Sequence, residues 1–277
     1  MAEHLLSAEN FLKIGEFIYR KSGIHLEKEK HYEKIAKYID KRAEELGVDS
    51  FRKYFFKLRF EDKEGEEFQE LMNGVTVNET YFFREKDQFE VLVDSILPDL
   101  DRIMPKNRPL RVLSSPCSTG EEPYSMILHM VEEGNLIEHR DIEVVGIDID
   151  STVIEKAKKA RYTERSVHAI PKDILGRWFV KKNLGYQLGD DLMGTVDFQV
   201  ANIFDKTMMR KLGKFDVIFS RNMLIYFDDA SRKEVAMTFY DMLNPGGYVL
   251  LGHAEYMSRI VSVFNAKKVG KTLVYQK

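Results

Sequence analysis

The chain changes character at about residue 108, and this change constrains the fold more than any other feature of the sequence. From there to the C-terminus, short apolar runs alternate with segments of helical periodicity. Such alternation is typical of a mainly parallel β-sheet covered by helices on both faces. The expected strands are RVLSS, IEVVGIDI, DFQVANI, FDVIFSRN, GYVLLGHA and TLVYQK. The sequence therefore predicts an α/β fold for this part of the chain.

Residues 1–76 differ from the rest because they show helical patterns only. The patterns are FLKIGEFIYRKSG, HYEKIAKYIDKRAEELG, FRKYFFKLR and EFQELMNG. In the first of them, apolar residues recur at helical spacing: Phe11, Ile14, Phe17 and Ile18. Gly47 follows the second pattern, at a position where glycine commonly ends a helix. We therefore expect an all-helical domain over residues 1–76.

The α/β domain is expected over residues 77–277. Within it, residues 173–200 carry WFVKK, GYQLGDD and TVDFQV, which are short segments separated by turns instead of helices. This stretch is predicted to form a small hairpin-rich insert.

Composition narrows the classes of function. With 44% hydrophobic and 31% charged residues, the 277-residue chain is typical of a soluble globular protein. A formal net charge of −3 gives no reason to expect a nucleic-acid partner. No apolar run approaches the roughly 20 residues of a membrane span, and MAEHLLSAEN lacks the features of a signal peptide. Cys117 is the single cysteine, so we expect a cytoplasmic protein with no metal, no disulfide and no membrane insertion.

The stretch SSPCSTGEEPYSM, residues 114–126, joins the first expected strand to a helix. In open α/β sheets, ligands bind at the carboxyl ends of the strands, near such a crossover. The turn lacks the glycine pattern of a phosphate loop, and Glu121 and Glu122 would repel a phosphate. A carboxylate in the first turn of a helix is stabilised by the helix N-terminus, and it can attract an amine.

Polar residues also follow the next expected strands. Asp148 ends the strand in GIDID, where an acidic side chain can accept hydrogen bonds from both ribose hydroxyl groups. Asp150 is better placed to cap the helix STVIEKAKKA. Asn202 in VANIFD and Asn222 in SRNMLIYF lie near strand ends, where an amide can bind an adenine edge or a carboxylate.

These residues together describe a ligand with a ribose, an adenine and an ammonium group but no phosphate. S-adenosylmethionine fits this description. The alternative is that Asp148 and Glu122 only cap helices.

The segment NETYFFRE, residues 78–85, connects the helical region to the α/β domain. We expect Tyr81, Phe82 and Phe83 to pack in the core. Arg84 follows this aromatic cluster and can bind a carboxylate through two parallel hydrogen bonds. Its alternative is a surface ion pair with a neighbouring acidic residue, which would contribute little energy.

Six motifs, in this order, closely resemble the CheR family of chemotaxis receptor methyltransferases: NETYFFRE, SSPCSTGEEPYSM, GIDID, ARYTERSV, SRNMLIYFD and LGHAE. The resemblance covers essentially the whole chain. It implies a class I S-adenosylmethionine-dependent methyltransferase with a Rossmann-like sheet, an N-terminal helical domain and an inserted antiparallel β-subdomain. It also implies methyl transfer to glutamates on the cytoplasmic signalling helices of chemoreceptors, with S-adenosylhomocysteine as the second product.

The resemblance further implies roles for individual residues. Glu122 is similar to the family carboxylate that meets the methionine amino group, with Glu121 as a substitute. Tyr226 resembles the family tyrosine placed near the transferred methyl group, and Arg84 is similar to a cofactor-site residue of the family. We expect both to be catalytic, by holding the substrate carboxylate or the cofactor in line. The implied cofactor contacts are Asn78, Thr80, Arg84, Glu121, Glu122, Asp148, Asn202, Ile203, Arg221 and Asn222.

A basic face is expected on the second helical segment, where Lys34, Lys37 and Lys41 recur at helical spacing. In the CheR family, basic residues of an N-terminal helix meet the acidic methylation region of the receptor. The resemblance therefore implies that Lys37, Lys41 and Arg42 bind substrate. The alternative is an ordinary solvated lysine face.

The insert departs from the family pattern in one respect. Some members bind a tethering receptor peptide at a glycine-rich turn of the β-subdomain, but KKNLGYQLGDDLMG has no clear G-x-G. We therefore expect that this protein does not use the tether. We also expect a monomer. Two other functions stay open, which are carboxyl methylation of a different acceptor and non-catalytic binding of receptors with S-adenosylmethionine.

Overall fold

The computed structural model describes residues 4–277, which divide into two compact units. The helical unit joins the N-terminal residues up to Val77 with Tyr226–Ser231, and the α/β unit contains Asn78–Ile225 and Arg232–Lys277. The segment Tyr226–Ser231 was expected in the α/β domain. It groups with the helical unit because Ile24 forms a β-bridge with Phe227 and the Tyr19 hydroxyl donates to Asp228 at 2.9 Å.

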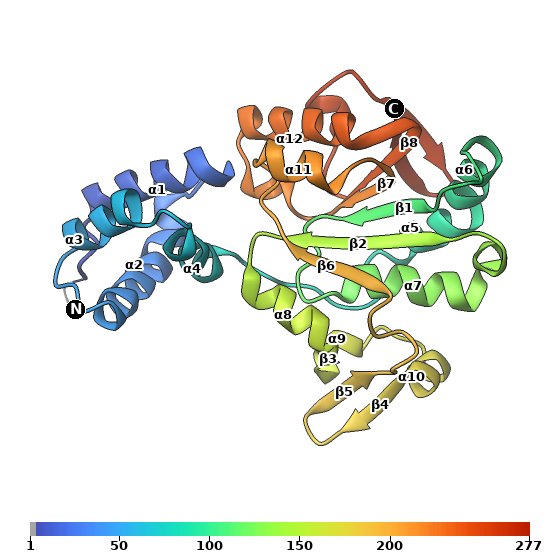
Figure 1. The fold of residues 1–277 in the computed structure, drawn as a ribbon, viewed down its shortest axis with the longest axis horizontal. Helices are drawn as coiled ribbons and strands as arrows, with labels where there is room; N and C mark the ends of the chain where they lie inside the picture. The colour runs from blue at the N-terminus through green and yellow to red at the C-terminus, as the bar shows by residue number, and fades with distance from the viewer. Residues whose placement is uncertain (1–3) are drawn as a thin grey trace. The chain divides into compact units, whose positions relative to one another are not determined.

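The helical unit contains four α-helices in the part of the chain that the structure describes (Figure 1). They are α1 (Ala8–Ser22), α2 (Lys28–Glu45), α3 (Phe51–Phe56) and α4 (Glu66–Val75), with a π-helical turn over Lys57–Glu61. Ser7 caps α1 by accepting a hydrogen bond from the Asn10 amide, and Gly23 ends it with a φ of 71°. The predicted helices of residues 1–76 are therefore all present.

The apolar face predicted for α1 forms part of the core of the helical unit. Phe11, Ile14 and Ile18 are buried, and Phe17 packs edge-on against Phe55 at a centroid distance of 5.9 Å. Burial of such side chains stabilises a helical domain by about 1.5–3 kcal/mol each.

The α/β unit contains all the remaining strands and helices. Its helices are α5 (Lys86–Val91), α6 (Leu97–Ile103), α7 (Glu121–Glu133), α8 (Ser151–Lys159), α9 (Glu164–Val167), α10 (Lys172–Trp178), α11 (Lys206–Leu212) and α12 (Asp229–Met242, which begins in the helical unit). Its strands are β1 (Leu110–Ser114), β2 (Ile142–Asp148), β3 (Arg161–Tyr162), β4 (Phe179–Lys182), β5 (Gly185–Leu188), β6 (Val196–Val200), β7 (Phe215–Ser220), β8 (Leu243–Leu251), β9 (Asn265–Val269) and β10 (Thr272–Gln276).

Seven of these strands form one sheet in the order β6-β2-β1-β7-β8-β10-β9. The strands from β6 to β8 are parallel, and β10 and β9 are added antiparallel. The chain leaves β1 toward β2 and β6 on one side and returns to β7 on the other, so the order of strands reverses beside β1. This reversal is the usual position of a ligand site in an open α/β sheet.

All six strands predicted from apolar runs are present, which confirms the predicted mainly parallel sheet. The prediction missed β9, the edge strand, because its sequence NAKKV is largely polar and exposed. The apolar strands were easier to find, since β7 is buried at every residue and therefore reads as a continuous apolar run.

A separate small antiparallel sheet has the order β3-β5-β4, and Figure 1 shows it with α10 apart from the large sheet. Its limits differ from the insert expected over residues 173–200. The small sheet begins before residue 173, because Arg161 pairs with Gln187. It ends before residue 200, because Val196 pairs with Val144 in the large sheet. Buried Val196 and Phe198 explain why β6 belongs to the main core.

Among the helices of residues 4–277, none combines the length and the apolar character needed to cross a bilayer.

Candidate functional site

The turn after β1 is fixed by main-chain hydrogen bonds to both neighbouring strands. The Ser115 amide donates to the Phe219 carbonyl at 2.9 Å, and the Cys117 amide donates to the Ile147 carbonyl at 2.8 Å. The Ser118 amide donates to the Asp148 carboxylate at 2.9 Å. The turn is therefore a rigid platform at the carboxyl ends of β1, β2 and β7.

Gly120 ends the turn, in a conformation and a space that favour a glycine. Its φ is 92°, and a Cβ atom would lie 3.0 Å from the Phe198 ring and 3.1 Å from the Ala157 Cβ. The residue is therefore required by the backbone conformation and by close packing of α7 against the sheet.

Asp148 is the last residue of β2 and is buried. Burial raises its pKa to about 6, although amide hydrogen bonds from Asp150 and Ser118 partly oppose the shift. The buried Ser118 hydroxyl oxygen has no hydrogen-bond partner among the described residues. The two carboxylate oxygens of Asp148, with the Ser118 hydroxyl in the same turn, could hydrogen-bond to the two hydroxyl groups of a ribose.

Asp150 caps α8, as predicted, by accepting hydrogen bonds from the Thr152 and Val153 amides. The same side chain accepts from Asn78 Nδ2 at 2.8 Å. Asn78, an expected cofactor residue, is thus held at the carboxyl end of β2.

A cavity of about 370 Å³ lies beside this platform. Its lining residues are Asn78, Glu79, Thr80, Tyr81, Arg84, Thr119, Glu121, Arg165, Ser166 and His168. Four of the expected cofactor residues are among them: Asn78, Thr80, Arg84 and Glu121. The cavity therefore brings together residues of the NETYFFRE segment and of the turn after β1.

The two adjacent glutamates of α7 have different environments. Glu121 lines the cavity and accepts from the Thr119 hydroxyl at 2.6 Å, and burial raises its pKa. Glu122 was expected to be the principal cofactor carboxylate, but it accepts from the Ser114 hydroxyl at 2.8 Å and from Arg221 at 3.0 Å. In this structure Glu121 faces the cavity and Glu122 is bound by protein groups, and which of the two meets the cofactor stays a prediction.

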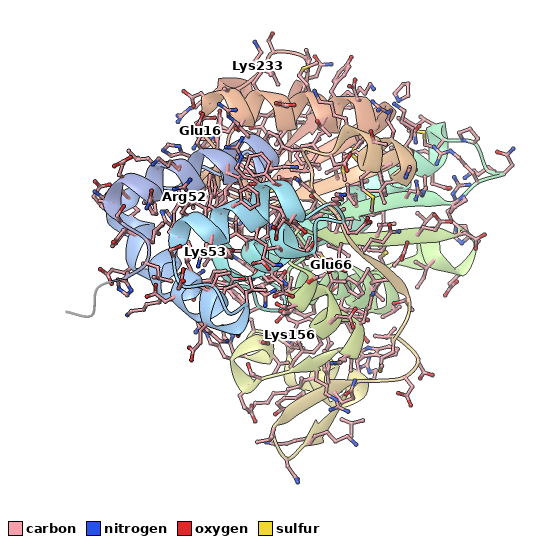
Figure 2. The ribbon with its side chains drawn as sticks, turned by 60° about the vertical axis from the view of Figure 1, so that its left-hand side comes forward. Glu16, Arg52, Lys53, Glu66, Lys156 and Lys233 are labelled. Atoms are coloured by element: carbon pink, nitrogen blue, oxygen red, sulfur yellow. The ribbon has the colours of Figure 1, made fainter. Side chains whose placement is uncertain are left out.

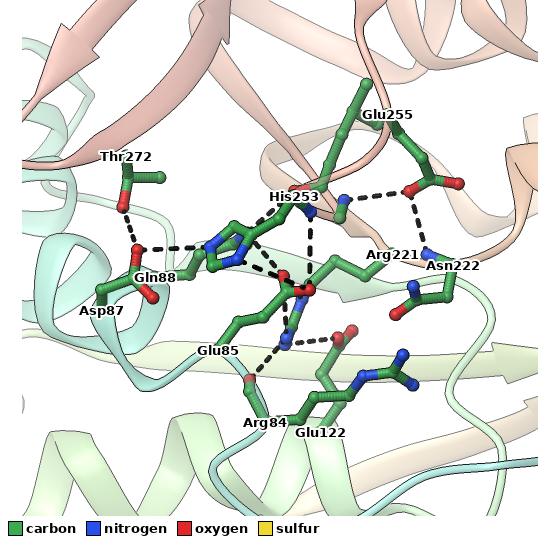
Figure 3. Close-up of polar contacts among 12 residues, drawn as sticks. Arg84, Glu85, Asp87, Gln88, Glu122, Arg221, Asn222, His253, Glu255 and Thr272 are labelled. Carbon is green, nitrogen blue, oxygen red and sulfur yellow. Dashed lines mark hydrogen bonds and ion pairs between the residues drawn. The ribbon is translucent and has the colours of Figure 1, made fainter.

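The guanidinium of Arg221 joins three segments of the protein (Figure 3), and its expected contact with the cofactor stays a prediction. It contacts Glu122, Glu85 at 3.1 Å and the main-chain carbonyl oxygen of Arg84. Burial raises the pKa of Glu122, and the charge of Arg221 opposes that shift. Arg221 therefore compensates buried carboxylates and holds the main chain at Arg84.

The main chain around Arg84 is held in an uncommon conformation. Phe83 and Glu85 have φ values of 60° and 55°, a region that residues other than glycine rarely adopt. The Phe83 amide donates to Ser125 Oγ at 3.0 Å. The Arg84 side chain is half-buried, and its Nη1 donates to the Glu79 carbonyl at 3.2 Å. The ion pair with an acidic neighbour that was considered for Arg84 is not its observed contact.

Residues after β7 are positioned by a buried carboxylate (Figure 3). Glu255 accepts hydrogen bonds from the amides of Asn222, Leu224 and Gly252 at 2.8–2.9 Å. Asn222 has a φ of 57°, so Glu255 holds another strained main-chain position. After β6, Asn202 accepts from the Phe204 amide at 3.0 Å and Ile203 is buried. Cofactor contacts for Asn202, Ile203 and Asn222 stay predictions.

The remaining expected residues lie in the helical unit. Tyr226 belongs to this unit, its carbonyl accepts from the His25 amide at 2.9 Å, and its catalytic role stays a prediction. Lys37 and Lys41 are exposed on α2. Figure 2 shows further basic side chains, Arg52 and Lys53, on the surface of α3.

Arg42, whose expected substrate-binding role stays a prediction, is bound to two acidic side chains of the protein. Its guanidinium makes three hydrogen bonds of 2.8–3.1 Å to the buried carboxylate of Glu67, and it also contacts Glu45. A buried carboxylate needs a cationic partner, so Arg42 stabilises the packing of α2 against α4.

The sequence reasoning missed several residues of the site. Arg165, Ser166 and His168 line the cavity, although ARYTERSV was noted only as a motif. Glu85 and Glu255 also escaped notice because their partners are distant in sequence. The ARYTERSV motif could have indicated Arg165 and Ser166, because its polar residues were not part of any predicted helix.

The sheet order, the buried acidic tip of β2 and the carboxylate at the cavity define a class I S-adenosylmethionine-dependent methyltransferase. Residues 78–272 match the family model described as the CheR methyltransferase SAM binding domain, and residues 9–76 match the CheR methyltransferase all-alpha domain. The chain belongs to the CheR methyltransferase family.

Curated relatives are similar over nearly the whole chain. Chemotaxis protein methyltransferase 2 of Vibrio cholerae is 42% identical, and the match covers 100% of this chain and 96% of the relative. The chemotaxis protein methyltransferase of Escherichia coli is 31% identical over 96% of this chain and 91% of its own. That of Salmonella typhimurium is 30% identical over 95% and 88%, respectively.

Proposed function

We propose that this protein transfers a methyl group from S-adenosylmethionine to side-chain carboxylates of glutamates on the cytoplasmic signalling helices of chemoreceptors. The products are glutamyl methyl esters and S-adenosylhomocysteine, and the enzyme acts as a cytoplasmic monomer. Family membership and the printed names of the relatives support the proposal. The observation that carries it is the cavity lined by Asn78, Arg84 and Glu121. The turn that carries Glu121 is also bound to Asp148, through the Ser118 amide.

Each group of residues has a distinct task in holding the cofactor. The Asp148 carboxylate and the Ser118 hydroxyl would bind the ribose hydroxyls, and Glu121 would bind the ammonium group. When bound, S-adenosylmethionine supplies an electrophilic sulfonium methyl group. Thr80 and Asn78 complete the wall of the cavity on the side of the NETYFFRE segment.

Catalysis requires alignment more than proton transfer. A glutamate is ionised near pH 7, so the acceptor needs no general base. We assign Arg84 to orient the acceptor carboxylate, since a guanidinium can hold both oxygens in one plane. Fixing two reactants in line can supply several kcal/mol of the barrier. The clamped main chain at Phe83, Arg84 and Glu85 keeps this arginine at the cavity.

The test is transfer of labelled methyl groups to receptor signalling-helix fragments, with release of the label by mild base as the mark of an ester. We expect Arg84→Ala to lower turnover on the order of 100-fold. Lys182→Ala, at an exposed residue of β4, is the control and should retain activity. Normal turnover and normal cofactor affinity in Arg84→Ala would exclude the role of Arg84. Cofactor binding without transfer to any receptor fragment would instead indicate an adaptor or a different acceptor.

A further inference from the structure

An exposed ion pair lies at the edge of the cavity. Arg165 of α9 contacts the Glu79 carboxylate at 2.7 Å, and both residues line the cavity with Arg84. The side chains of Arg165 and Glu79 are 83% and 75% exposed. The pair therefore sits where the cavity meets solvent.

The ion pair is not needed to hold this wall in place. The Phe82 amide donates to the Ser166 carbonyl at 2.9 Å, and the rings of Tyr81 and His168 lie 4.9 Å apart. These two contacts already join α9 to the NETYFFRE segment. An exposed ion pair contributes only about 0–1 kcal/mol to stability, so the charges of Glu79 and Arg165 are available for another role.

We propose that Arg165 receives the anionic acceptor at the mouth of the cavity, and that Glu79 competes with the acceptor for this arginine. The proposal rests on the proposed function, because a direct methyl transfer requires the acceptor to enter the cavity that holds Arg84. The partner is an acidic peptide. A carboxylate of the peptide replaces the Glu79 carboxylate on Arg165, so one exposed ion pair is exchanged for another at little cost.

Selectivity follows from this exchange. Without Arg165, the Glu79 carboxylate would repel an approaching anion. A neutral peptide would gain nothing from Arg165 and could not displace Glu79. The other lining residues with acidic or basic side chains are Arg84, Glu121 and His168. Arg84 contacts Glu79 only through the main-chain carbonyl, so changing the Glu79 side chain leaves that contact intact.

The experiment measures the affinity of an acidic receptor signalling-helix fragment for the full-length protein by titration calorimetry, at about 20 mM and about 300 mM salt. At low salt we expect Glu79→Gln to tighten binding about threefold and Arg165→Gln to weaken it about fivefold. The double variant should bind more tightly than Arg165→Gln alone, because the repulsive carboxylate is gone. These differences should shrink at high salt.

A matched control is the exposed Lys181–Glu164 pair at 3.3 Å, whose members do not line this cavity. Glu164→Gln and Lys181→Gln should leave fragment affinity unchanged. Weaker or equal binding by Glu79→Gln would overturn the proposal, as would parallel changes in S-adenosylmethionine affinity. Fragment affinity is measured without turnover, so this proposal is tested even if the wild-type protein methylates no receptor fragment. A lack of methylation would contradict the proposed function and would leave the binding test of Arg165 and Glu79 valid.

Discussion

Arg221 Nη1 lies 3.0 Å from Glu122 Oε2, and the Arg221 side chain is only 3% exposed. The same guanidinium contacts Glu85 and the carbonyl oxygen of Arg84. One buried cation thus connects the end of β7, the first turn of α7 and the segment that carries Arg84.

Replacing Arg221 tests this connection. Arg221→Met would leave two carboxylates, Glu85 and Glu122, without their cation. We expect the free energy of unfolding to fall by about 3 kcal/mol, measured by urea denaturation. The control is Glu143→Gln, which breaks the more exposed pair with Arg111 and should cost less than about 1 kcal/mol. Equal losses in the two variants would contradict the assigned role of Arg221.

Cofactor binding should depend on the ionisation of Asp148. Burial raises the pKa of Asp148 to about 6, so the carboxylate is ionised above that pH and protonated below it. A protonated carboxyl group accepts ribose hydrogen bonds poorly, so affinity should fall as the pH drops through about 6. Asp148→Asn should bind more weakly and should lose the part of the pH dependence that Asp148 contributes, while the part contributed by Glu121, whose pKa burial also raises, should stay. Titration calorimetry with S-adenosylmethionine measures both effects.

The control for this pH dependence is Asp197→Asn, at an exposed residue of β6. Its affinity profile should match the wild-type profile. If Asp148→Asn kept the wild-type pH dependence, another group would be responsible. Folding stability should change with pH in the opposite direction to cofactor affinity, because the pKa of Asp148 in the folded protein lies above its ordinary value of 3.8. In the absence of ligand, its contribution to folding stability decreases as pH rises from about 4 to about 6.

Arg42 is expected to act on stability. Arg42→Ala would leave the buried Glu67 carboxylate without its principal partner, and we expect a loss of about 2 kcal/mol in the free energy of unfolding. Glu45→Gln, which removes only the exposed partner of Arg42, is the control. Thermal unfolding of the two variants measures the difference. A stable Arg42→Ala protein with weakened receptor binding would contradict this stability role and would support the substrate-binding role expected from the sequence.

Lys37 and Lys41 are expected to act on substrate binding, since both are exposed. Charge reversal with Lys37→Glu and Lys41→Glu should slow receptor methylation severalfold at low salt and less at high salt, because ions screen the attraction. Steady-state rates at two salt concentrations measure the effect, with Lys13→Glu on α1 as a charge-matched control. Rates that equal those of the control at low salt would exclude this surface from receptor binding.

The polar groups at strand ends could be predicted because their positions follow from local pattern. Apolar runs located the strands, and each strand end placed the next polar residue at the edge of the sheet. Asp148 and Asp150 illustrate this. Asp148 is the last residue of an apolar run, and Asp150, two residues later, directly precedes a helical pattern, so the first is predicted at the strand tip and the second as the helix cap. The insert limits could not be predicted, because Arg161 finds Gln187 only after the chain has turned back.

The sequence by itself determined the helical domain, the mainly parallel sheet and the acidic turn at its centre. Periodicity and short-range spacing encode these features, and both can be read along the chain. Only the tertiary structure decided which of Glu121 and Glu122 faces the cavity. Adjacent residues of a helix point in directions about 100° apart, and the arginine that binds Glu122 lies 99 positions away in sequence. The ion pair of Arg42 with Glu67 was also decided by the tertiary structure. A buried charge pairs with an opposite charge on whichever segment the fold places beside it, and that segment can be distant in sequence.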